Sequence, residues 1–168
     1  MPSNPTEWRL SEPTLPMPVI ERSAIVPLPL EETWEAFFGD QMQNWVRFSD
    51  AVVDVRDYRM RPDGTPEYVM ANRAGPMKLS HRSDYVTYDP PHRAEDDTLE
   101  SALGGRWVSV HEPVEGGTRV THRWDVEPHG VMKILFPLMR KPMSRAFQQD
   151  LDQMAERIRQ AQQRPSPA

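Results

Sequence analysis

The sequence has no cysteine among its 168 residues. Disulfide bonds, a thiolate nucleophile and a cysteine-based zinc ribbon are therefore excluded. The five histidines are scattered, and no two of them have the helical spacing of zinc ligands. A phosphate-cradling glycine loop and a GxSxG nucleophile motif are missing as well. We therefore expect no metal site, no cofactor and no nucleophilic catalysis.

Long hydrophobic runs are also absent. The longest, Ala24–Leu30 and Ile134–Met139, contain proline and fall far short of the roughly 20 residues that span a bilayer. We therefore expect no stable membrane insertion. The first ten residues lack a basic patch followed by an apolar stretch, so we expect no secretory signal. Together with the missing cysteines, these features favour a cytoplasmic protein.

The chain has no excess of positive charge. Its formal net charge is −5 and its sequence pI is about 5.5, with arginines interleaved among acidic residues. A nucleic-acid-binding protein usually presents a net basic face, so we expect no nucleic-acid partner. The sequence leaves open whether the protein is a monomer or a homodimer.

The length fits a single domain, and 38% hydrophobic residues suffice for a core. The 18 prolines cluster near both ends and at presumed turns, where they separate elements instead of filling them. We expect a proline-rich N-terminal arm over residues 1–17, one domain over residues 18–160 and a flexible tail over residues 161–168.

Turn-forming residues divide the middle of the chain into strand-like stretches. They occur at Arg61–Gly64, Asp89–Pro91 and Glu115–Gly117, and we place a further turn at Gly104–Gly105. Their spacing predicts an antiparallel meander of about six or seven strands. The expected strands are Val19–Val26, Val52–Met60, Glu67–Arg73, Lys78–Tyr88, Arg93–Leu103, Arg106–His111 and Thr118–Glu127, with short helices over Leu30–Phe38 and Gln41–Phe48.

The C-terminal part has helical periodicity from Val131 to Arg159, with apolar residues at three- and four-residue steps. Pro137 and Pro142 predict a kink or a short lead-in helix, followed by a regular helix over about Met143–Gln160. An apolar helix stripe must be buried, and the sheet is the available partner. The sequence therefore predicts an α+β fold in which a curved sheet wraps around the last helix and encloses a cavity for a small, largely apolar molecule.

Three segments resemble the SRPBCC or START-like helix-grip superfamily, which includes polyketide cyclases, aromatases and lipid-transfer domains. Ala24–Trp34 resembles its first strand, proline and short helix, and Tyr88–Arg93 resembles its characteristic turn. Gly105–Trp107 together with Glu115–Thr121 resembles its last hairpin. The resemblance covers about residues 19–160. It implies a helix-grip fold and a cofactor-independent protein that binds a hydrophobic ligand.

A narrower resemblance concerns Leu79–Arg82. In bacterial aromatase/cyclases a similar strand carries Trp, Ser and Arg at alternating positions that face the pocket; here Ser80 and Arg82 match, and Lys78 replaces the tryptophan. In a cyclase-like enzyme Arg82 would stabilise an enolate or carbonyl oxygen, with Ser80, Tyr68 or His122 relaying protons. The alternation itself places Lys78, Ser80, Arg82 and Asp84 on one face of the strand. It leaves open whether that face lines the cavity or meets solvent.

Other candidates come from alternation in neighbouring strands. Val120, His122, Trp124 and Val126 share an apolar face that should point inward, so that Trp124 floors the pocket. His122 is then either a general base or a satisfied core histidine. Trp107 either lines the pocket or caps the outside.

Further ligand contacts are expected from the next strand and from the helix. Tyr68, Met70 and Asn72 are expected to face inward, and Tyr68 and Asn72 would orient a ligand. Met139, Met143 and Phe147 belong to the apolar helix stripe, which is either plain core or a lining suited to flexible ligands.

The sequence supports two main functions. The first is a polyketide cyclase-like enzyme that folds a reactive chain and assists cyclisation and dehydration, with Arg82, Ser80 and His122 as catalytic residues. The second is a carrier that binds a lipid or hydrophobic metabolite without chemistry. A third, weaker possibility is a protein-interaction role for the arm and its Trp8.

Overall fold

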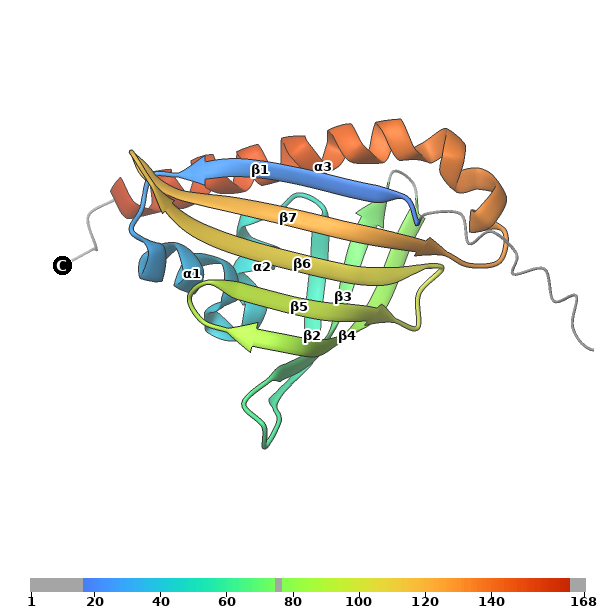
Figure 1. The fold of residues 1–168 in the computed structure, drawn as a ribbon, viewed down its shortest axis with the longest axis horizontal. Coiled ribbons are helices and arrows are strands. Elements are labelled where there is room, and N and C mark those ends of the chain that lie inside the picture. The colour runs from blue at the N-terminus through green and yellow to red at the C-terminus, as the bar shows by residue number, and fades with distance from the viewer. Residues whose placement is uncertain (1–16, 75–76, 164–168) are drawn as a thin grey trace, which may run out of the picture.

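The computed structural model describes residues 17–74 and 77–163 (Figure 1). Its centre is a seven-stranded antiparallel sheet in the order β1-β7-β6-β5-β4-β3-β2. The strands are β1 (Val19–Val26), β2 (Val52–Met60), β3 (Pro66–Ala74), β4 (Met77–Asp89), β5 (Arg93–Leu99), β6 (Leu103–Val114) and β7 (Gly117–Pro128). The helical elements are α1 (Leu30–Phe38), the short turn η1 (Asp40–Met42), α2 (Gln43–Phe48) and α3 (Met132–Gln163).

The sheet curves, and α3 runs along it beside β1 (Figure 1). The predicted α+β class, the antiparallel meander and the grip of the sheet on its last helix are confirmed. Two clusters of buried side chains fill the interior. The larger joins α1 and the second half of α3 to the sheet, and includes Phe37, Val120, Leu151 and Met154. The smaller, which we call the end cluster, consists of Ile20, Leu103, Val126, Met132 and Phe136.

The predicted turn at Gly104–Gly105 is wrong. Strand β5 ends at Leu99, the chain turns through residues 100–102, and β6 already begins at Leu103. Gly105 lies within β6 with a φ of +111°, and a Cβ atom there would collide with the backbone oxygen of Asp125 on β7. Glycine at this position permits two backbones to approach closely, which is the other common reason for a glycine within a strand.

The C-terminal helix is one continuous element with Pro137 and Pro142 inside it. A separate lead-in helix, one of the two alternatives expected from the prolines, is therefore wrong. Figure 1 shows that the first turns of α3 bend away from the axis of the rest of the helix. Proline within a helix commonly causes such a bend. The helix also continues to Gln163, into the expected tail. None of the helices in the described ranges combines the length and apolar character needed to cross a bilayer.

Contacts between α3 and the loop before β2 fix the second half of the helix. Asp150 is buried, and its carboxylate accepts hydrogen bonds from the Ser49 hydroxyl at 2.7 Å and from the backbone N–H groups of Asp50 and Ala51 at 2.8 and 3.2 Å. Arg157 donates to the Phe48 carbonyl at 3.0 Å. Because a buried carboxylate needs several donors, this arrangement holds the helix and the loop at one side of the cavity described next.

Candidate functional site

A cavity of about 220 Å³ lies between the sheet and α3. Its walls come from both ends of the sheet and from one face of the helix, as expected for a sheet that curls around a helix. Most of the lining is apolar or aromatic. The lining includes Tyr68, Met70, Asn72, Leu79, His81, Ser83, Tyr85, Asp96, Trp107, Trp124, Met143 and Phe147.

Several of the predicted contacts do line this cavity. Tyr68, Met70 and Asn72 on β3 face it, as does Trp124 on β7. Trp107, whose orientation the sequence left open, also lines it. From α3, Met143 and Phe147 contribute as expected. Met139 does not; it packs against the end cluster instead.

Strand β4 presents the opposite face from the one favoured by the aromatase/cyclase resemblance. Leu79, His81, Ser83 and Tyr85 line the cavity. Of the two alternatives that the sequence left open, the one in which Ser80, Arg82 and Asp84 face the cavity is therefore wrong.

On the outer face, Arg82 pairs with Glu67 at 3.4 Å and with Glu100 at 3.1 Å. Asp84 pairs with Arg61 on the same face. These ion pairs satisfy the charges in contact with water, whereas Leu79 and the ring of Tyr85 take inner positions.

A polar patch on β3, β4 and β5 interrupts the apolar lining. We call its four side chains the polar wall: Tyr68, Ser83, Tyr85 and Asp96. The two tyrosine hydroxyls lie 2.9 Å apart and form a hydrogen bond. Asp96 is only 3% exposed, and burial raises its pKa to about 7, an effect that the neighbouring Ser83 hydroxyl partly opposes. Burial likewise raises the pKa of both tyrosines, which therefore stay protonated.

Near neutral pH the polar wall thus contains a carboxyl group that is present in both its acid and its base form, next to the hydrogen-bonded pair of phenol hydroxyls. Such a group can donate a hydrogen bond to a carbonyl oxygen in its acid form, or accept a proton in its base form.

Four lining residues were not predicted from the sequence: Asp96, Ser83, Tyr85 and His81. A signal for Asp96 was present, because alternation in β5 separates Asp96 from its charged neighbours Glu95 and Asp97, whose side chains pair with Arg93 and Arg106 on the outer face. Glu95 and Asp97 have arginine partners on the outer face, so Asp96 between them points inward, on the same side as the buried Ala94. This pattern indicates a buried carboxyl group.

A second polar pair lies farther along the cavity. The Asn72 amide approaches Nδ1 of His81 at 3.4 Å. Burial lowers the pKa of His81 to about 4, so its ring is neutral at neutral pH and offers one donor and one acceptor. The pair adds hydrogen-bonding capacity without adding charge.

His122 faces inward as predicted but does not line the cavity. It is fully buried and is surrounded by the rings of Phe37, Trp45, Trp107 and Phe147, whose centroids lie 4.9 to 6.2 Å from its own. Burial lowers its pKa to about 3. It is not among the residues that line the cavity and it binds protons poorly, so the geometry gives it a packing role instead of that of a general base.

Within residues 17–74 and 77–163, no three histidine or carboxylate side chains gather as a metal site would require. The cavity therefore offers hydrogen bonds, one carboxyl group of raised pKa and a large apolar surface. These are the means of holding a mainly apolar molecule that carries one or a few oxygen atoms.

Residues 17–159 match the family described as "Polyketide cyclase / dehydrase and lipid transport". This match spans most of the chain, and the chain therefore belongs to that family. No curated protein matches the sequence.

Several solved structures share the fold. TTHA0849 from Thermus thermophilus is 18% identical, with a TM-score of 0.71 over 86% of this chain and 99% of that one. The Zhui aromatase/cyclase from Streptomyces sp. R1128 is 12% identical, with a TM-score of 0.67 over 90% and 99%. One part of StfQ, a di-domain aromatase/cyclase of the steffimycin biosynthetic pathway, gives 15% identity and a TM-score of 0.66 over 86% of this chain and 52% of that one. At these identities the likeness establishes the fold.

Proposed function

We propose that the protein binds a small, mainly apolar molecule bearing a carbonyl or hydroxyl oxygen, of polyketide or lipid type, in the cavity between the sheet and α3. The observation that carries the proposal is the cavity itself, in which an apolar lining is interrupted by the polar wall of Tyr68, Ser83, Tyr85 and Asp96. The apolar lining supplies affinity, and the polar wall orients the oxygen. The family description, which joins cyclases with lipid transport, supports this ligand class.

Binding can be tested with the fluorescent probe 1-aminoanthracene and by native mass spectrometry of the purified protein. The variant Leu79→Trp enlarges a side chain that points into the cavity and should abolish probe binding. Val86→Trp on the outer side of the same strand is the matched control, because Val86 is 49% exposed. Equal probe affinity in the two variants would contradict the proposed site.

A second candidate function is catalysis of cyclisation or dehydration within the same cavity, as in the aromatase/cyclases of this fold. The observation that favours it is the buried Asp96, whose pKa of about 7 suits proton transfer at neutral pH. In a dehydration, the ionised Asp96 takes the proton from the carbon next to a ketone and then returns it to the leaving hydroxyl, which departs as water. One of the Tyr68 and Tyr85 hydroxyls donates to the other, and the hydroxyl whose proton is free donates a hydrogen bond to the ketone oxygen while that oxygen carries negative charge.

Asp96→Asn separates the two functions. If the protein is an enzyme, this variant should no longer convert a β-hydroxyketone, which is measured by the ultraviolet absorbance of the conjugated product. It should keep its affinity for 1-aminoanthracene. Asp97→Asn, which changes the outer face of the same strand, should keep both. Absence of any turnover by the unaltered protein, together with a co-purified lipid in the native mass spectrum, would favour the carrier over the enzyme.

A further inference from the structure

The beginning of α3 is apolar on the side that faces away from the protein as well as on the side that faces the core. Met132 and Phe136 are buried, but Val131, Ile134, Leu135 and Leu138 are 65, 77, 40 and 79% exposed. These four residues follow each other at steps of three, one and three, so they lie on one face of the helix. We call them the outer stripe. A helix that is apolar on all sides usually has a partner on each of them.

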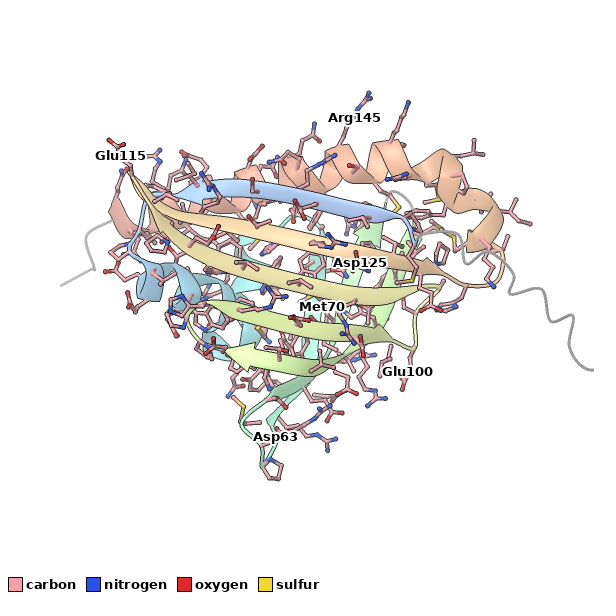
Figure 2. All side chains as sticks on the ribbon, viewed as in Figure 1. Asp63, Met70, Glu100, Glu115, Asp125 and Arg145 are labelled. Carbon is pink, nitrogen blue, oxygen red and sulfur yellow. The ribbon has the colours of Figure 1, made fainter. Side chains whose placement is uncertain are left out.

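The charge around the outer stripe differs in sign from that of the chain. No acidic residue occurs between Glu127 and Asp150, whereas Lys133, Arg140, Lys141 and Arg145 fall in this segment of a chain whose net charge is −5. All four basic side chains are exposed. Figure 2 shows Arg145 directed away from the sheet on the outer side of α3. Among the residues that the structure describes, none of the four forms an ion pair with a carboxylate.

We propose that the outer stripe and its basic residues dock the protein on the surface of a bilayer that contains anionic lipid. A helix with an exposed apolar face and lysine and arginine beside it lies in the plane of the interface, with the apolar side chains in the acyl region and the cations among the headgroups. A second copy of the chain fits this surface less well. A symmetric dimer through the outer stripe would bring two sets of the same basic residues together, and like charges across an interface repel.

The inner side of the same segment packs against residues that line the cavity. Met132 and Phe136 belong to the end cluster, which contacts the cavity-lining Trp124 and Phe147. Pro137 and Pro142 have no N–H, so two hydrogen bonds of a regular helix cannot form in this segment. If the cavity holds the proposed ligand, docking places this side of the cavity beside the acyl layer, from which an apolar molecule can enter. Only this last step rests on the proposed function; docking itself does not.

Co-sedimentation of the full chain with vesicles tests the docking surface. We expect binding to vesicles of phosphatidylcholine with one quarter phosphatidylglycerol, weaker binding to phosphatidylcholine alone, and loss of the difference at high salt. Ile134→Ser with Leu138→Ser should lower the partition coefficient about tenfold for each residue. The matched control is Ile25→Ser with Val86→Ser, two side chains that are 52 and 49% exposed elsewhere on the sheet.

The basic residues have their own control. Lys141→Gln and Arg145→Gln should each weaken binding about fivefold, whereas Arg119→Gln, exposed on β7, should not. Failure of the unaltered protein to bind the anionic vesicles, or equal binding by the stripe and sheet variants, would overturn the proposal. So would a dimer in light scattering that the Ile134→Ser, Leu138→Ser variant loses, since a second copy would then occupy the stripe. These variants should bind 1-aminoanthracene in the cavity as well as the unaltered protein does. If the unaltered protein does not bind the probe, the ligand proposal is refuted and the docking proposal still stands.

Discussion

Replacing Asp96 with asparagine should stabilise the fold above neutral pH and change it little near pH 4. Burial raises the pKa of Asp96 to about 7, whereas an aspartate in an unfolded chain titrates near 3.9. Between these two values the folded protein holds a proton that the unfolded chain has released. The stability of the unaltered protein therefore decreases as the pH rises through this window, by about 1.4 kcal/mol per pH unit from this group.

The full penalty for a buried, ionised Asp96 is about 4 kcal/mol once the pH exceeds 7, from a pKa difference of about three units. Asparagine has nearly the same shape and no charge, so Asp96→Asn avoids the penalty. It forfeits at most about 1 kcal/mol if one hydrogen bond is lost. We therefore expect the variant to exceed the unaltered protein by about 3 to 4 kcal/mol at pH 8, and by less at each lower pH.

Urea unfolding at pH 5, 6, 7 and 8 measures this difference. Asp97→Asn is the control, because Asp97 lies next in the chain, faces outward and pairs with Arg106 at 2.9 Å. Exposed ion pairs contribute about 0 to 1 kcal/mol to stability, and the effect of this substitution should not change between pH 5 and 8. A difference between Asp96→Asn and the unaltered protein that stays constant from pH 5 to 8 would refute the assignment of a raised pKa to Asp96.

Three further changes probe the packing. Burial lowers the pKa of His81, His111 and His122 to about 4, 4 and 3, so their contribution to stability is complete above pH 6.5 and is lost on acidification. In the Asp96→Asn background, the free energy of unfolding from urea titrations should fall by about 4 kcal/mol per pH unit between pH 6.5 and 4, and a flat profile would contradict this. Gly105→Ala should lower the free energy of unfolding by about 3 kcal/mol, because the new Cβ meets the β7 backbone. The control Gly64→Ala lies in open space at a φ of +83° and should lower it by about 1 to 2 kcal/mol. Equal shifts in the melting temperature would disprove the close approach. Asp150→Ala leaves the hydrogen-bond donors of the Ser49–Ala51 loop unpaired and should lower the free energy of unfolding by about 3 kcal/mol. If its urea midpoint changes no more than that of the exposed Asp152→Asn, Asp150 does not hold the loop to the helix.

The sequence was sufficient for the order of elements and for most strand limits, because turn residues and apolar periodicity act locally. It was insufficient for the orientation of β4. A two-residue period assigns Lys78, Ser80, Arg82 and Asp84 to one face, but which face turns inward depends on the partners across the strand. Glu67 lies on the neighbouring strand and is held by Arg59 and Arg61, which keep its pKa near 2 and fix the charged side of the sheet outside.

The glycines at the start of β6 illustrate the same limit. Gly104 and Gly105 carry the composition of a turn, and nothing in the local sequence distinguishes a turn from a close contact between strands. The distinction depends on the register of β6 with β7, where Gly105 lies opposite Val126. The register follows from the whole sheet, so it could not be inferred from the segment alone.

The polar wall also restricts the ligand, since an apolar molecule without oxygen would add no hydrogen bond to the one that the Ser83 hydroxyl gives the buried Asp96 carboxyl. A ketone accepts a hydrogen bond from the acid form of Asp96 and should raise its pKa further, so ketone affinity should fall as the pH rises above 7. An alcohol donates to the ionised form and should lower the pKa of Asp96, so its affinity should rise over the same interval. Titrations of the unaltered protein with a matched ketone and alcohol, at pH 6 and pH 8, should therefore give opposite changes, and both should disappear in Asp96→Asn. Parallel changes for the two ligands would show that Asp96 does not contact the bound oxygen.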